Sequence, residues 1–136
     1  MTLSEAASDD KKIKNIKGPE IVKADILEPI VYKSHRDINI VIKQPEFTSL
    51  CPMTGLPDFG CITVKYRPDK KIIELKSLKF YLLQYRNVGI FYEHVVNRIM
   101  DDLVEKLSPK SIEVTGDFTS RGGITTQTSV EFTGKK

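Results

Sequence analysis

The chain has 136 residues, of which 40% are hydrophobic, and its net charge of +3 at pH 7 comes from 21 basic and 18 acidic side chains. This length predicts one domain, and so mild a charge argues against direct binding to nucleic acid. No run approaches the ~20 apolar residues of a membrane helix. The polar N-terminus lacks a secretory signal, so we expect a cytoplasmic protein.

The chain opens with a polar stretch of mixed charge at residues 1–18, which predicts a disordered tail before a single domain at 19–136. Alternating isoleucines in 36–43 predict a first strand. The stretch CPMTGLPDFG at 51–60 contains two prolines and a glycine that interrupt regular structure, so we expect a loop. Residues 61–67 alternate again and predict a second strand.

Both helices are predicted in the second half of the chain. Residues 71–87 begin extended and become apolar at helical spacing from Ser77, which is predicted to be the N-cap. In 91–107 apolar residues recur every three or four positions, the pattern of an amphipathic helix. Ser108 and Pro109 are expected to end it.

Two more strands are predicted near the C-terminus, at 111–118 and 124–132, with a bulge at Gly116 and a loop at 119–123. The order β-β-α-α-β-β predicts an α+β domain, in which a four-stranded antiparallel sheet carries two helices on one face. Such a sheet has two free edges and an uncovered face. We therefore expect an oligomer that joins sheets edge to edge.

Cys51 and Asp58 are the first candidates for chemistry. A thiol has an ordinary pKa near ~8.5 and needs a nearby positive charge or helix end to react at neutral pH. Asp58 cannot supply that help, because a carboxylate raises the pKa of a neighbouring thiol. The pair instead fits a nucleophile and a proton donor that act on different atoms of one substrate. The alternative is a buried structural cysteine beside an ordinary turn.

Two glutamates and four cations are further candidates. Glu74 and Glu93 have apolar neighbours in sequence, and a carboxylate can accept two adjacent N–H donors of a guanine-like ring. The alternative is that one is a charge near a helix dipole and the other a charge on an edge strand.

The four cations are Lys76, Lys79, Arg86 and Arg121. Together they could hold a nucleotide phosphate, since two glycines follow Arg121 and let backbone N–H groups approach an anion. The alternative is a solvated helix face. His35 and His94 stand alone and the two cysteines have no metal-ligand spacing, so no metal site is predicted.

Four separated stretches resemble one known family. They are EFTSLCPMTGLPDFG at 46–60, ELKSLKFY at 74–81, RNVGIFYE at 86–93 and RGGI at 121–124. In order and spacing they resemble the NADPH-dependent 7-cyano-7-deazaguanine reductases, the QueF family, over about residues 36 to 132. The length of the chain matches the short, single-domain form of that family.

The resemblance implies a function, an assembly and a set of site residues. Enzymes of this family reduce a nitrile to a primary amine with two NADPH in queuosine biosynthesis, a tRNA modification pathway. They have the tunnelling fold, which assembles into pentameric rings that stack into a decamer, with active sites at subunit interfaces. The resemblance implies that Cys51 attacks the nitrile carbon to form a thioimide and that Asp58 protonates the nitrogen. It also implies substrate binding by Ile73, Glu74, Leu75, Tyr92 and Glu93, and contact of cofactor phosphates with Lys76, Lys79 and Arg121.

One position departs from the family pattern, because Tyr92 stands where most members have histidine. A tyrosine offers an O–H group, but with an ordinary pKa near ~10 it does not change charge near neutral pH. Its effect on substrate affinity and on the pH profile is open. Two alternative functions also stay open. One is an amidine-forming transferase, which would use the Cys51 thioimide without hydride, and the other is a non-catalytic protein that binds a purine or pterin.

Overall fold

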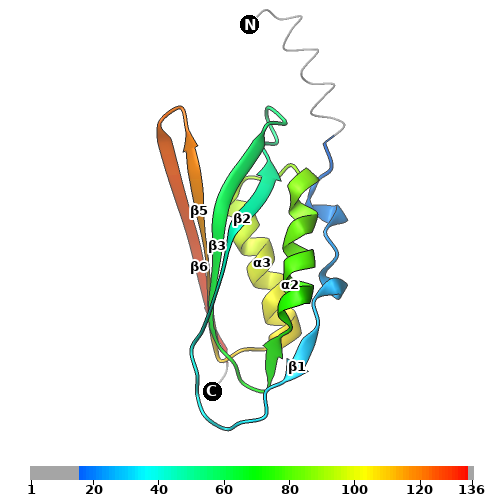
Figure 1. The fold of residues 1–136 in the computed structure, drawn as a ribbon, viewed down its shortest axis with the longest axis vertical. Coiled ribbons are helices and arrows are strands. Elements are labelled where there is room, and N and C mark those ends of the chain that lie inside the picture. The colour runs from blue at the N-terminus through cyan, green and yellow to red at the C-terminus, as the bar shows by residue number, and fades with distance from the viewer. Residues whose placement is uncertain (1–15, 135–136) are drawn as a thin grey trace, which may run out of the picture.

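A four-stranded antiparallel sheet carries two helices on one face (Figure 1), as the sequence predicted. The computed structural model describes residues 16–134. The strand order is β2-β3-β5-β6, and a second, two-stranded sheet pairs β1 with β4. The elements are β1 (Pro29–Val31), β2 (Ile40–Leu50), β3 (Pro57–Arg67), β4 (Lys71–Ile73), α2 (Leu75–Leu83), α3 (Tyr92–Leu107), β5 (Ser111–Arg121) and β6 (Ile124–Thr133), with short 3-10 helices at Pro19–Ile21, Ala24–Ile26 and Gln84–Asn87.

The first hairpin differs from its prediction at both strands. β2 begins later than predicted and continues past Pro45 to Leu50. Proline cannot donate a backbone hydrogen bond, but β2 is an edge strand, and the register with β3 shifts between Gln44 and Phe47. The second half of the predicted loop is also wrong, because Pro57 begins β3, a position where proline is tolerated.

Glu74, rather than Ser77, caps helix α2. The Glu74 carboxylate accepts hydrogen bonds from the backbone N–H groups of Lys76 and Ser77, and the Ser77 hydroxyl donates to the Glu74 carbonyl at 2.7 Å. Ser77 therefore lies in the first turn. The helix begins three residues earlier than an N-cap at Ser77 would allow.

The second hairpin is longer and tighter than predicted. β5 continues to Arg121, so the predicted loop shrinks to a turn at Gly122 and Gly123, whose φ angles of 56° and 84° favour glycine. No bulge occurs at Gly116, and the irregularity lies between Phe118 and Arg121 instead. A Cβ at Gly116 would lie 2.7 Å from the Phe118 ring. Glycine is therefore required there to make room for that ring.

The core lies between the sheet and the helices. It includes Ile62, Val64, Val114 and Phe118 from the sheet and Leu78, Tyr81, Val95, Ile99 and Leu103 from the helices. Lys17, which the sequence placed in a disordered tail at 1–18, bridges to Val88, and its carbonyl accepts the Gly89 N–H at 2.8 Å. The part of that prediction covering residues 1–15 lies outside the described residues.

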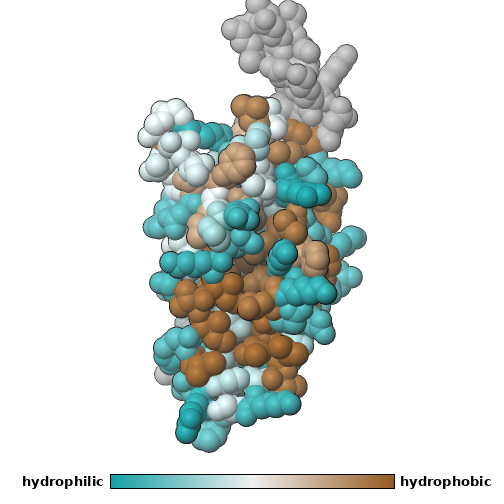
Figure 2. All heavy atoms as spheres, viewed as in Figure 1, coloured by the Kyte–Doolittle hydropathy of each residue, from teal (hydrophilic) through white to brown (hydrophobic). Residues whose placement is uncertain are grey.

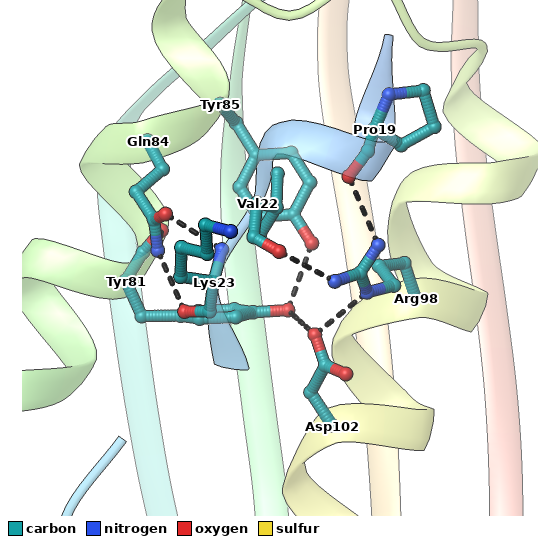
Figure 3. A network of polar contacts seen from close by, with 8 residues as sticks. All are labelled: Pro19, Val22, Lys23, Tyr81, Gln84, Tyr85, Arg98 and Asp102. Carbon is teal, nitrogen blue, oxygen red and sulfur yellow. Dashed lines mark hydrogen bonds and ion pairs between the residues drawn. The ribbon is translucent and has the colours of Figure 1, made fainter. Parts of the chain in front are cut away.

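A buried polar network ties the N-terminal segment to both helices (Figure 3). The Tyr81 hydroxyl donates to Asp102 and lies 2.8 Å from the Tyr85 hydroxyl. Arg98 forms an ion pair with Asp102 at 2.8 Å and donates to the carbonyls of Pro19 and Val22. Burial raises the pKa of Tyr81, helped by the negative charge of Asp102, so this tyrosine stays a neutral donor.

Arg98→Met is expected to lower the free energy of unfolding by about 3 kcal/mol, because it leaves the Asp102 carboxylate buried without its counter-ion. Urea unfolding measures the loss. Arg86→Met is the matched control, since this arginine is exposed, and it should change the stability by less than ~0.5 kcal/mol. Equal losses in the two variants would contradict a structural role for the network.

Candidate active site

Cys51 and Asp58 lie together at the closed end of the β2–β3 hairpin. Cys51 directly follows β2, and Asp58 is the second residue of β3. A tight turn joins them: the Cys51 N–H donates to the Leu56 carbonyl at 2.9 Å, and the Gly55 N–H donates to the Cys51 carbonyl at 2.8 Å. Cys51 and Asp58 are each only 4% exposed. The hairpin therefore places a buried thiol and a buried carboxyl group side by side.

Arg121 bridges these two residues from the end of β5. Its Nη1 donates to the Cys51 Sγ at 3.4 Å, and its Nη2 lies 2.6 and 2.7 Å from the two oxygens of Asp58. The sequence grouped Arg121 with Lys76 and Lys79 as a candidate for cofactor phosphates. The structure brings it to Cys51 and Asp58. One guanidinium contacts both predicted catalytic groups.

Tyr92 completes the cluster. It is the first residue of α3, and its hydroxyl donates to the Asp58 Oδ1 at 2.9 Å and accepts from the Arg121 Nε at 3.1 Å. Its ring stacks on Phe118, a residue that the sequence did not single out, with centroids 3.9 Å apart. Burial and the hydrogen bond to Asp58 raise the pKa of Tyr92. A histidine at this position would change charge near neutral pH, whereas Tyr92 stays neutral and donates its hydrogen bond to Asp58.

The surroundings of Cys51 favour its thiolate form. Burial alone raises the pKa of the thiol. Hydrogen bonds from the hydroxyl and backbone N–H of Thr54, from the backbone N–H of Met53 and from the Arg121 guanidinium act in the opposite direction and outweigh it. The net pKa lies below its usual value, which is the condition for a reactive cysteine.

Glu93 lies at the same end of the molecule, in the first turn of α3. Its side chain is exposed, and its carboxylate makes no hydrogen bond or ion pair within residues 16–134. It is therefore available to a ligand beside Tyr92.

Four of the remaining predicted residues lie at the opposite end. Ile73, Glu74, Leu75 and Lys76 belong to β4 and the start of α2, at the bottom of Figure 1, whereas the β2–β3 turn is at the top. Lys79 lies in the middle of α2. The Ile73 N–H donates to the Tyr66 hydroxyl at 3.0 Å. Tyr66 follows Asp58 by eight residues along β3, a distance of about 26 Å. One copy of the chain does not bring Glu74 to Cys51.

Within residues 16–134, no three His, Cys, Asp or Glu side chains are grouped so that they could hold a metal ion. None of the helices there is long and apolar enough to cross a membrane.

Comparison with known proteins places the chain in a family. The family model described as QueF-like protein matches residues 57–136, which is more than half of the chain. The chain belongs to the QueF family. A protein of Chlorobaculum parvum named NADPH-dependent 7-cyano-7-deazaguanine reductase is 58% identical over 102 residues, covering 75% of this chain and 88% of that protein. One of the same name from Chloroherpeton thalassium is 49% identical over 116 residues, covering 85% of this chain and all of that protein.

A solved structure supports the fold of this QueF-family chain. The apo form of the archaeosine synthase QueF-Like matches with a TM-score of 0.65 at 19% sequence identity, covering 76% of this chain and all of that one. At so low an identity the match shows the fold alone. It agrees with the mixed α+β class and the antiparallel sheets described above.

Proposed function

We propose that this chain is an NADPH-dependent 7-cyano-7-deazaguanine reductase, which converts the nitrile of its substrate to a primary amine. The observation that carries the proposal is the Cys51–Arg121–Asp58 bridge, in which a thiol of lowered pKa and a buried carboxyl group meet at one guanidinium. A relative that is 58% identical over 102 residues carries this name. The pairing of thiol and acid is what addition to a nitrile requires.

The first step is addition of the Cys51 thiol across the C≡N bond. Sulfur bonds to carbon, the thiol proton ends on nitrogen, and one C–N π bond is lost, so no electrons are exchanged. Asp58 accepts the thiol proton and delivers it to the nitrogen, and Arg121 stabilises the thiolate that this transfer leaves before attack. The product is a thioimide, which accepts hydride more readily than a nitrile does. NADPH supplies the two hydrides that, with two protons, convert the thioimide to the amine and release the thiol.

Lys76, Lys79 and Arg121 are the residues proposed to hold the cofactor. Both lysines are exposed on α2, and cations of this kind suit the phosphates of NADPH. The side chain of Arg121 is 51% exposed, so it can reach a ligand on the surface as well as Asp58. The chain therefore offers a suitable set of donors, divided between α2 and the end of β5.

That division supports a homo-oligomer. Ile73, Glu74 and Leu75 are proposed to bind the purine-like ring with Tyr92 and Glu93. In one copy, however, about 26 Å of β3 separates Asp58, which Tyr92 contacts, from Tyr66, which Ile73 contacts. A neighbouring copy supplies the missing half if its β4–α2 end meets the Cys51 end. The assembly proposed is the tunnelling-fold decamer of two stacked pentamers.

The surface is suited to such contacts. β2 and β6 are free edges of the sheet, and Figure 2 shows apolar residues gathered over the lower half of the molecule. Exposed large apolar side chains include Ile30, Val31, Val41, Leu75 and Phe80. Burial of these side chains between copies would remove apolar surface from water. The place in queuosine biosynthesis, the cytoplasmic location and the absence of direct contact with nucleic acid remain predictions from the sequence.

Spectroscopy and mass spectrometry test the reaction. Mixing the protein with 7-cyano-7-deazaguanine in the absence of NADPH should give a thioimide absorbance and an adduct mass on Cys51. Added NADPH should then be consumed at two equivalents per amine formed. An adduct without NADPH consumption would instead indicate the amidine-forming transferase, and ligand binding without any adduct would indicate a non-catalytic binding protein.

A further inference from the structure

The hydroxyl of Ser49 has no hydrogen-bond partner, although Ser49 is 0% exposed. Among residues 16–134 it is the one buried side-chain nitrogen or oxygen in this condition. An unpartnered hydroxyl in the interior is unfavourable, because it has lost its hydrogen bonds to water. An alanine at position 49 would avoid this loss of free energy. A serine is favoured there only if its hydroxyl gains a hydrogen-bond partner in another state of the protein.

The partner that is closest by sheet register is Asp58. Ser49 on β2 lies directly opposite Asp58 on β3. Opposed residues of an antiparallel pair project to the same face of the sheet, with Cβ atoms roughly 4.5–5.5 Å apart. The unused hydroxyl and the buried carboxyl group therefore share one face, next to Cys51. Asp58 takes all its side-chain hydrogen bonds from Arg121 and Tyr92.

Arg121 occupies the space that a substrate needs. Its guanidinium contacts the Cys51 Sγ with one nitrogen and the Asp58 carboxylate with another. A nitrile attacked by Cys51 and protonated by Asp58 must span these same two groups, with its carbon at sulfur and its nitrogen at the carboxyl. The guanidinium and the nitrile cannot both lie there. Arg121 is half exposed and adjoins the Gly122–Gly123 turn, whereas Asp58 is buried in a strand, so Arg121 is the group that moves.

We propose that Ser49 is a positioning residue that replaces Arg121 as the donor to Asp58 when substrate enters. Asp58 loses the guanidinium, and the Ser49 hydroxyl turns to its carboxyl group. When Asp58 gives its proton to the nitrile nitrogen, the Ser49 O–H donates to the carboxylate that is formed; the Ser49 proton stays on its oxygen. This inference rests on the proposed function, and it explains why a buried hydroxyl without a partner is present beside the acid.

A double-mutant cycle tests the exchange without substrate. In the wild-type background, Ser49→Ala should leave the urea midpoint unchanged or raise it, because the hydroxyl has no partner there. In an Arg121→Met background, where Asp58 lacks the guanidinium, Ser49→Ala should lower the midpoint, because the hydroxyl has taken over. The same change in both backgrounds would overturn the proposal. The outcome does not depend on whether the chain is a reductase.

Adduct kinetics give a second and separate test. Ser49→Ala should slow thioimide formation about tenfold, the effect of one hydrogen bond to a charged group. It should also move the pH midpoint of adduct formation upward, because without the hydroxyl the carboxylate is less stabilised. Thr63→Val removes a buried hydroxyl from the opposite face of the sheet and should leave the rate and the midpoint as in wild type.

Two results of the adduct kinetics would contradict the role proposed for Ser49. A Ser49→Ala rate within twofold of wild type, or a slower rate with an unmoved pH midpoint, would overturn the proposal. Failure of the wild-type protein itself to form an adduct would refute the proposed reductase, and the unfolding cycle would still decide the exchange between Ser49 and Arg121.

Discussion

Cys51→Ala is expected to abolish both thioimide formation and NADPH consumption, lowering kcat by roughly 10⁴-fold or more, as loss of a nucleophile does in other enzymes. Cys51 Sγ is the thiol that contacts Arg121, which also holds the acid Asp58. Alanine keeps the turn, because the hydrogen bonds that close it use the Cys51 backbone. The substrate should therefore still bind, and equilibrium dialysis of 7-cyano-7-deazaguanine against the variant measures this.

Cys61→Ala is the matched control for that variant. Cys61 is the other free cysteine and lies on β3, on the face of the sheet that is turned away from the helices. Its loss should leave the rate of NADPH consumption within about twofold of wild type. Retention of reductase activity by Cys51→Ala, or its loss in Cys61→Ala, would contradict the assignment of the nucleophile.

The predictions that succeeded rest on local periodicity. The helix predicted at 91–107 is α3, Tyr92–Leu107, because its apolar stripe is written within the segment itself. The predicted end of β2 and the predicted start of β3 were wrong, and a proline lies at each of these places. Whether Pro45 or Pro57 ends a strand depends on whether that strand lies at an edge of the sheet, and this depends on pairing with residues far away in sequence.

The site residues, too, could be predicted only where neighbouring residues in sequence were enough to indicate them. The sequence indicated Cys51 and Asp58 because they share one hairpin. Arg121 is 70 residues from Cys51, and only the arrangement of strands brings its hairpin to that thiol. Ser49 was not foreseen, because its lack of a partner is a property of the packed structure. Glu74 and Glu93 were grouped by chemistry, and within one chain they lie at opposite ends.

Because Cys51 and Glu74 lie at opposite ends of one chain, a mixture of two inactive variants is expected to recover reductase activity. The Cys51→Ala and Glu74→Gln variants are each expected to lack reductase activity, because the first has no thiol at position 51 and the second has no carboxylate at position 74. Glutamine keeps an oxygen that can cap α2. If each site takes Cys51 from one copy and Glu74 from another, co-refolding equal amounts gives about a quarter of the sites both wild-type groups, and about a quarter of wild-type activity.

The arrangement of the cluster supplies the control for this experiment. Cys51 and Asp58 share one hairpin and one guanidinium, so a mixture of Cys51→Ala with Asp58→Asn contains no complete site however the copies assemble. Its activity should stay at the mean of the two parents. Recovery in that control, or its absence in the mixture with Glu74→Gln, would mean that the site is not shared in this way. Because about 26 Å of β3 separates Asp58 from Tyr66, which contacts Ile73 beside Glu74, recovery in the test mixture alone would make assembly a requirement for catalysis.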